Sequence, residues 1–111
     1  MSRSRDRGNS WERTCAGLFG GKRMPNDGKG GADVVTPTLV IECKRVDEAS
    51  VRGAWIEQGR EHSRAHGLPW LVVHARKGSS LSTTTMDTRL ALELLKAAGM
   101  VPETLTDEEA A

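Results

Sequence analysis

The stretch of sequence that decides the fold is ADVVTPTLVIECK, residues 32–44. Two apolar runs, 32–35 and 39–43, flank Thr36-Pro37-Thr38, and this pattern predicts a β-hairpin. If its loop has an even number of residues centred on Pro37-Thr38, Asp33 lies directly opposite Glu42, with Cβ atoms roughly 5 Å apart. One hairpin then places two carboxylates side by side.

The second strand of this hairpin also positions a lysine. Because alternate side chains of a strand share a face, Glu42 and Lys44 point one way and Cys43 points the other. Two ionised carboxylates at this spacing repel by about 3 kcal/mol at an effective dielectric constant of about 20, and a divalent cation removes the repulsion. Hard oxygen ligands without a nearby Cys or His pair favour Mg²⁺, or Mn²⁺, over Zn²⁺. The backbone carbonyl of Cys43 is a further candidate ligand.

These groups suit hydrolysis of a phosphodiester. A metal ion at Asp33 and Glu42 polarises a phosphate oxygen and activates a bound water, while Lys44 orients that water or stabilises the added negative charge. A structural alternative remains open, because charged residues at the end of an edge strand are commonly just solvated. A short D…ExK pattern also arises by chance in many proteins.

The segment before the hairpin predicts a helix and a loop. Ser10 is the expected N-cap of the helix, which ends at Gly20-Gly21. The predicted apolar stripe of this helix consists of Trp11, Cys15, Leu18 and Phe19. Residues 22–31 are polar and rich in Gly, so we expect a mobile loop there.

The segment after the hairpin alternates between helix and strand. A helix is predicted over 47–66 and ends at Gly67-Leu68-Pro69; its expected inward face holds Val51, Ala54, Trp55, Gln58, His62 and Ala65. Strands are predicted over 70–75 and 81–86. Asp87 is the expected N-cap of a last helix that reaches about Ala98; its expected inward residues are Leu90, Leu94 and Ala97.

Length and composition indicate one domain. The 111 residues are 37% hydrophobic and 28% charged, with a net charge of +1. Mixed helices and strands at this length predict an α/β domain with a mixed β-sheet flanked by helices. We expect a flexible basic arm at 1–9, the folded domain at 10–99 and an acidic tail at 100–111. Without an apolar run of membrane length or a signal segment, we expect a cytoplasmic protein with both cysteines reduced.

The chemistry-bearing residues resemble the PD-(D/E)xK nuclease superfamily. The resemblance rests on Asp33, the Glu42-Cys43-Lys44 run, the preceding Gly30-Gly31, and Arg7 to Glu12, a basic, Gly-containing start that leads to a glutamate. It covers about residues 7–96, and Ala32 replaces the proline that gives the motif its first letter. Holliday junction resolvase-like and phage endonucleases are the most similar members. The resemblance implies a restriction-endonuclease-like fold.

The resemblance also implies roles for further residues. Glu12 is a third acidic residue of the metal site, and Gln58 occupies the position of a glutamine that recurs in parts of the superfamily. Two interpretations of Gln58 stay open: it positions the metal-bound water or Lys44, or it is a satisfied polar group inside a helix interface. The strand at 70–75 followed by Arg76-Lys77 is similar too. A zinc site from His62, His66, Cys15 and Cys43 is disfavoured, because strand alternation sends Cys43 away from Glu42. The three tryptophans fall at positions where core packing is expected.

The resulting functional hypothesis is a Mg²⁺-dependent, structure-selective DNA endonuclease, above all a Holliday junction resolvase acting as a homodimer of phage or prophage origin. Basic residues expected to contact DNA are Arg5, Arg7, Lys22, Arg23, Lys29, Arg45, Arg76 and Lys77. Two alternatives stay open. One is a nicking, repair or restriction-like endonuclease of the same fold, and the other is a noncatalytic DNA-binding module.

Overall fold

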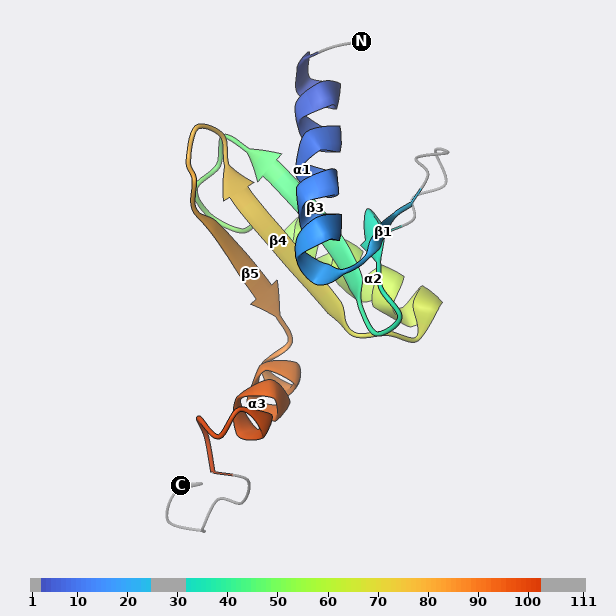
Figure 1. Ribbon diagram of the computed structural model, residues 1–111, viewed down its shortest axis with the longest axis vertical. Helices are drawn as coiled ribbons and strands as arrows, with labels where there is room; N and C mark the ends of the chain where they lie inside the picture. The colour runs from blue at the N-terminus through green and yellow to red at the C-terminus, as the bar shows by residue number, and fades with distance from the viewer. Residues whose placement is uncertain (1–2, 25–31, 103–111) are drawn as a thin grey trace.

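The domain is a five-stranded mixed sheet with helices on both faces (Figure 1). A computed structural model describes residues 3–24 and 32–102 and, in the first helix, side chains from Ser10 onward. In chain order the elements are α1 (Arg3–Phe19), β1 (Lys22–Arg23), β2 (Val34–Val35), β3 (Val40–Val46), α2 (Gly53–His66), β4 (Trp70–Arg76), β5 (Ser82–Met86) and α3 (Thr88–Ala97). The sheet order is β1-β2-β3-β4-β5, with β3 and β4 parallel and the other neighbours antiparallel.

The predicted hairpin is formed by β2 and β3. Val34 pairs with Ile41 and Val35 with Val40, which is the register that sets Asp33 opposite Glu42. The buried Thr36 hydroxyl accepts hydrogen bonds from the backbone N–H groups of Thr38 and Leu39, so it closes the turn. Both the hairpin and its register are therefore confirmed, although β2 is shorter than predicted and β3 extends to Val46.

Two hydrophobic clusters pack the helices against the sheet, one cluster on each face. On one face, Trp11 and Cys15 of α1 pack with Ile41 and Val73, and the Trp11 indole N–H donates to the Val73 carbonyl (3.3 Å). On the opposite face, Trp55 of α2 packs in a cluster that holds Val40, Trp70 and Val72. Figure 1 shows α1 in front of the sheet and α2 behind it. All three tryptophans are buried, as predicted.

The first helix and its loop differ from the prediction. The helix α1 begins at Arg3, so Ser10 lies within it and is not its N-cap, and most of the expected flexible arm at 1–9 is helical. Helix extension adds one backbone hydrogen bond per residue once the packed turns exist, and this favours the earlier start. Leu18 is 68% exposed, not part of the core. Lys22–Arg23 form β1 against β2 instead of loop, and residues 25–31 lie outside the described residues.

The second helix begins later than predicted, at Gly53 instead of Asp47. The chain between β3 and α2 is tied to the sheet, because the Glu48 carbonyl accepts a hydrogen bond from the His74 ring. The buried residues of the helix are Trp55 and Gly59; Ala54, Gln58 and Ala65 are exposed, so much of the expected inward face was wrong. The helix ends as predicted, with Gly67 in the left-handed conformation (φ 67°).

The last helix leaves the body of the domain. Asp87 caps α3 as predicted, by accepting a hydrogen bond from Arg89 N–H (2.8 Å). No residue of α3 is buried, however. Leu94 is 52% exposed and Ala97 is exposed, so the prediction that both point into the core was wrong. Figure 1 shows α3 projecting away from the end of β5. None of the helices in the described parts of the chain is long and apolar enough to cross a membrane.

Candidate active site

Glu42 is the most buried charged group of the hairpin. Its residue is 4% exposed on β3, and one carboxylate oxygen contacts Nδ1 of His62 on α2. Burial, and then the negative charge of Asp33, raise the pKa of Glu42 to about 7, while His62 and Lys44 act to lower it. A carboxylate that is costly to ionise alone is a group that a nearby cation would stabilise.

Asp33 is held beside Glu42 by the backbone. The Cys43 N–H donates a hydrogen bond to Asp33 Oδ2 (2.8 Å), so the aspartate carboxylate is fixed against the middle of β3. The influence of Asp33 on the pKa of Glu42 follows from this placement. The hairpin thus gathers the two carboxylates that the sequence predicts to be neighbours.

Lys44 completes this group. It lies two residues after Glu42 on β3, half-buried, and its charge lowers the pKa of Glu42. Glu42 and Lys44 share the face that α2 covers, while Cys43 lies with Cys15 on the α1 side, as strand alternation predicts. The two cysteines are free thiols. The pKa of Cys43 is raised, mainly by its hydrogen bond with Cys15 and secondly by burial.

Glu12 is engaged elsewhere. Its carboxylate on α1 accepts hydrogen bonds from Arg23 Nη2 (3.1 Å) and Arg23 Nε (3.3 Å), and the pair is half-buried. In this conformation Glu12 neutralises Arg23 of β1, and α1 packs on the face opposite to that of Glu42 and Lys44. Over residues 3–24 and 32–102, no three His, Cys, Asp or Glu side chains are grouped to hold a metal ion.

On α2, the side chain that reaches the site is that of His62 and not that of Gln58, the residue that the sequence suggested. Gln58, the expected water-positioning residue, is exposed, and His62, one turn further on, makes the contact with Glu42. Sequence reasoning missed His62 as a site residue. The available signal was the pair of polar residues that interrupts the apolar stripe of this helix, although the stripe does not tell which of the two reaches the sheet.

The donor set of the hairpin suits a hard divalent cation. Asp33 and Glu42 supply carboxylate oxygens, and the Cys43 carbonyl follows Glu42 on the same strand. The pKa of Glu42 is raised first by burial and second by the charge of Asp33, and a cation beside both carboxylates would offset both effects. Mg²⁺ takes few protein ligands and keeps several waters, so two carboxylates and a carbonyl are a sufficient set. The residues present therefore fit a magnesium ion.

The basic residues expected to contact DNA are spread over the domain. Lys22 and Arg76 are exposed and Lys77 is half-buried. Arg23 is paired with Glu12. Arg45 is half-buried and lines a hollow of about 340 Å³ beside Trp11, on the face opposite to that of Lys44; its buried Nε has no hydrogen-bond partner among the described residues. The side chains of Arg5 and Arg7, and all of Lys29, lie outside the described residues.

The mixed sheet with flanking helices is shared with a solved Holliday junction resolvase, and this agrees with the nuclease-type fold that the sequence resemblance implied. One solved structure with a matching fold is Hjc, a Holliday junction resolvase from the archaeal hyperthermophile Archaeoglobus fulgidus. The match has a TM-score of 0.50 at 18% sequence identity and covers 86% of this chain and 98% of that chain. Comparison with models of protein families and with curated proteins finds no match.

Proposed function

We propose that this protein is a Mg²⁺-dependent DNA endonuclease that cuts branched DNA, as a Holliday junction resolvase does. The observation that carries the proposal is the buried Glu42 beside Asp33, with Lys44 on the same strand face, within a nuclease fold. Such a cluster is costly for a protein that only binds phosphate, because carboxylates repel the DNA backbone unless a cation lies between them.

Each residue of the cluster has a proposed task. Asp33, Glu42 and the Cys43 carbonyl would hold Mg²⁺, which would supply Lewis acidity toward a phosphodiester oxygen. The Cys43 N–H keeps the Asp33 carboxylate aimed at this position, and His62 keeps the Glu42 carboxylate there. The Lys44 ammonium donates hydrogen bonds to the attacking water or to the phosphate oxygens, where negative charge grows in the transition state.

Two further residues stay as predictions of the resemblance. Glu12 would join the acidic site after release from Arg23, whose guanidinium could then bind DNA phosphate instead. Gln58, exposed on α2 one turn before His62, is the proposed contact to water or to Lys44 when DNA is bound.

We propose a homodimer as the active form, because resolving a four-way junction takes two paired cuts and twofold symmetry supplies two sites. A hollow of about 480 Å³ runs between α3 and the sheet and is lined mainly by apolar side chains; they include Phe19, Leu39, Leu71, Met86, Leu90 and Leu94. The last nine residues of the sequence, 103–111, include four acids and one large apolar residue and suit this hollow poorly. The α3 helix of a second copy suits it well.

Cleavage of labelled four-way junction, flap and duplex DNA in Mg²⁺ tests the proposal. Symmetric cuts in the junction, abolished by chelator and reduced at least about 100-fold in Asp33→Asn and Lys44→Ala, are the expected result. If the protein instead cuts flap or duplex DNA, and both variants lose this activity, the proposed active site is correct but the proposed substrate is wrong. The nicking, repair or restriction-like alternative would then replace the resolvase.

The noncatalytic alternative makes a distinct prediction. A DNA-binding module would bind the same DNA equally well in chelator and in Mg²⁺, would leave every substrate uncut, and would not need Asp33. Because Asp33→Asn removes a negative charge, it would strengthen binding by such a module. That combination of results would overturn the catalytic assignment.

A further inference from the structure

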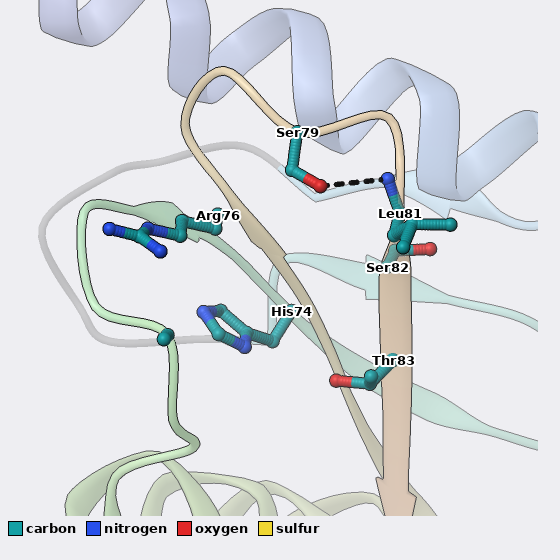
Figure 2. A pocket seen from close by; sticks show the side chains of 7 residues that line it. His74, Arg76, Ser79, Leu81, Ser82 and Thr83 are labelled. Carbon is teal, nitrogen blue, oxygen red and sulfur yellow. Dashed lines mark hydrogen bonds between the residues drawn. The ribbon is translucent and has the colours of Figure 1, made fainter.

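A polar pocket lies between the end of β4, the start of β5 and the loop that follows β3 (Figure 2). Its volume is about 210 Å³, and its polar side chains are those of His74, Arg76, Ser79, Ser82 and Thr83. Among the described residues, no carboxylate lines it. The acids of the nearby loop are Asp47 and Glu48, and the carboxylate of Glu48 is paired with Arg52 (3.5 Å). The pocket is therefore suited to an anion.

Arg76 supplies the positive charge. Its side chain is exposed, and within the described parts of the chain it has no acidic partner, in contrast to Arg23, Arg52 and Arg60. The backbone around it is fixed, because Lys77 N–H donates to the Val46 carbonyl (2.8 Å). A guanidinium held at a strand end without an acid beside it is available to bind a phosphate.

The pocket wall is rigid. His74 is 4% exposed; its ring lies 5.1 Å from the Trp55 ring, and Nε2 is 2.9 Å from the Glu48 carbonyl. Because a carbonyl only accepts, Nε2 carries the hydrogen of that bond. Over residues 3–24 and 32–102, the other nitrogen, Nδ1, has no hydrogen-bond partner. Figure 2 shows the Thr83 hydroxyl pointing toward this ring.

The pocket adjoins the candidate active site through the sheet. Lys44 pairs with His74 across β3 and β4, and His74 pairs with Thr83 across β4 and β5. Residues paired in this way point to the same face of a sheet, and neighbouring strands lie about 4.8 Å apart. Lys44, His74 and Thr83 thus form one row, which runs from the catalytic cluster into the pocket.

We propose that this pocket binds a phosphodiester of the DNA backbone next to the one that is cut. The inference rests on the proposed function and deepens it. Arg76 pairs with the phosphate charge, the hydroxyls of Thr83 and Ser79 donate hydrogen bonds to its oxygens, and the fixed His74 ring shapes the wall. The bound phosphate holds the DNA strand in register, so that the neighbouring phosphate lies at Asp33, Glu42 and Lys44.

Binding of duplex and junction DNA tests this subsite, with Ca²⁺ in place of Mg²⁺ to prevent cleavage. Each phosphate contact adds about −0.9 to the slope of log K against log salt concentration. We expect Arg76→Gln to weaken binding about tenfold and to flatten the slope by about 0.9, and Thr83→Val to weaken binding with no change in slope. Arg13→Gln removes the same charge from an exposed position on α1 and should leave both quantities unchanged. An unchanged slope in Arg76→Gln overturns the proposal.

A neutral phosphate analogue locates the contact. Methylphosphonate is placed at one position after another in the cut strand, and binding is measured for the wild type and for Arg76→Gln. One position beside the cut should weaken binding by the wild type and have no further effect on Arg76→Gln. Equal losses in both proteins at every position would contradict a phosphate subsite at Arg76.

Inorganic phosphate separates failure of the pocket from failure of the proposed function. Its titration is followed by NMR of the backbone amides of Ser82 and Thr83. If the wild type neither binds nor cuts DNA, the nuclease proposal fails, and saturable shifts of these amides that vanish in Arg76→Gln still support an anion pocket. A different result would count against the pocket alone: the wild type binds and cuts DNA, phosphate causes no shift of these amides, and Arg76→Gln leaves the salt slope unchanged. The proposed phosphate subsite would then be wrong, and the proposed nuclease function would stand.

Discussion

At the scale of single residues, the raised pKa of Glu42 links metal binding to stability. A carboxyl group whose pKa rises from about 4.5 to about 7 on folding favours the folded state below the lower value, and this contribution is lost as the pH rises through about 7. Above pH 7 the folded protein therefore carries an unfavourable buried charge. A bound cation removes that cost and so stabilises the protein most at alkaline pH.

Glu42→Gln should accordingly stabilise the metal-free protein at pH 8, by about 1–3 kcal/mol, and change little at pH 4.5. The physical reason is that glutamine fills the same space without a charge. Thermal unfolding in chelator at the two pH values measures the difference. Addition of Mg²⁺ should raise the melting temperature of the wild type more than that of Glu42→Gln, and an equal rise in both would argue against metal binding by Glu42.

His62→Ala should raise the Mg²⁺ concentration that gives half-maximal cleavage, by about tenfold, because the Glu42 carboxylate loses the group that orients it. The exposed His66 on the same helix is the matched control, and His66→Ala should leave the Mg²⁺ requirement unchanged. The Mg²⁺ dependence is measured at a temperature at which both variants are fully folded in chelator, so that a raised Mg²⁺ requirement reports positioning of Glu42 and not refolding by the metal ion.

Residues that come from one hairpin were predictable from the sequence. Asp33 and Glu42 are opposite each other because a short turn and strand alternation fix their relation locally. The contacts of Glu12 and His62 were not predictable in the same way. Each lies on a helix, and packing against distant strands decides which of its side chains reaches the site.

At the scale of elements, the joint between α1 and β1 depends on a close approach. A Cβ atom on Gly21 would lie 2.7 Å from Val34 Cγ1 and 2.9 Å from Thr36 Cγ2, both of them in buried residues. Gly21→Ala should thus destabilise the domain by about 1–3 kcal/mol. Chemical denaturation measures the change.

Gly17→Ala is the matched control for this joint. Gly17 lies inside α1, and a Cβ atom there would have nothing within 4 Å, so alanine should stabilise the helix by about 0.5–1 kcal/mol. Opposite signs for the two substitutions are the expected outcome. Stabilisation by both would mean that Val34 and Thr36 do not approach Gly21 this closely in solution.

Element boundaries followed local signals only where these were strong. The glycine after α2 and the aspartate before α3 marked helix ends that the structure has, because both act through backbone hydrogen bonds of their own turn. The strand β1 has no apolar pattern and exists through pairing with β2. The orientation of α3 was misjudged because an amphipathic pattern predicts an apolar face and does not identify what covers it.

At the scale of the whole molecule, the exposed leucines of α3 bear on assembly. Leu94→Glu puts a charge into the apolar hollow and should convert the proposed dimer to monomer. Sedimentation equilibrium measures the change, and cutting of a junction on two strands should fall more than nicking of one strand. Leu18→Glu places the same charge at another exposed leucine, on α1, and should leave the dimer intact. A wild-type protein that sediments as a monomer at all concentrations would contradict the assembly.

The residues of the proposed catalytic cluster lie close together in the sequence, and this affects how such a protein can change over evolutionary time. The hairpin residues proposed to bind the metal ion, together with Lys44, span only 33–44, one turn and part of two strands. The rest of the chain has to preserve a shape but few particular side chains, and a solved structure of the same fold is only 18% identical to this chain. A lineage of this kind keeps its chemistry in a dozen or so consecutive positions, and these are where laboratory recombination between distant homologues should be least tolerated.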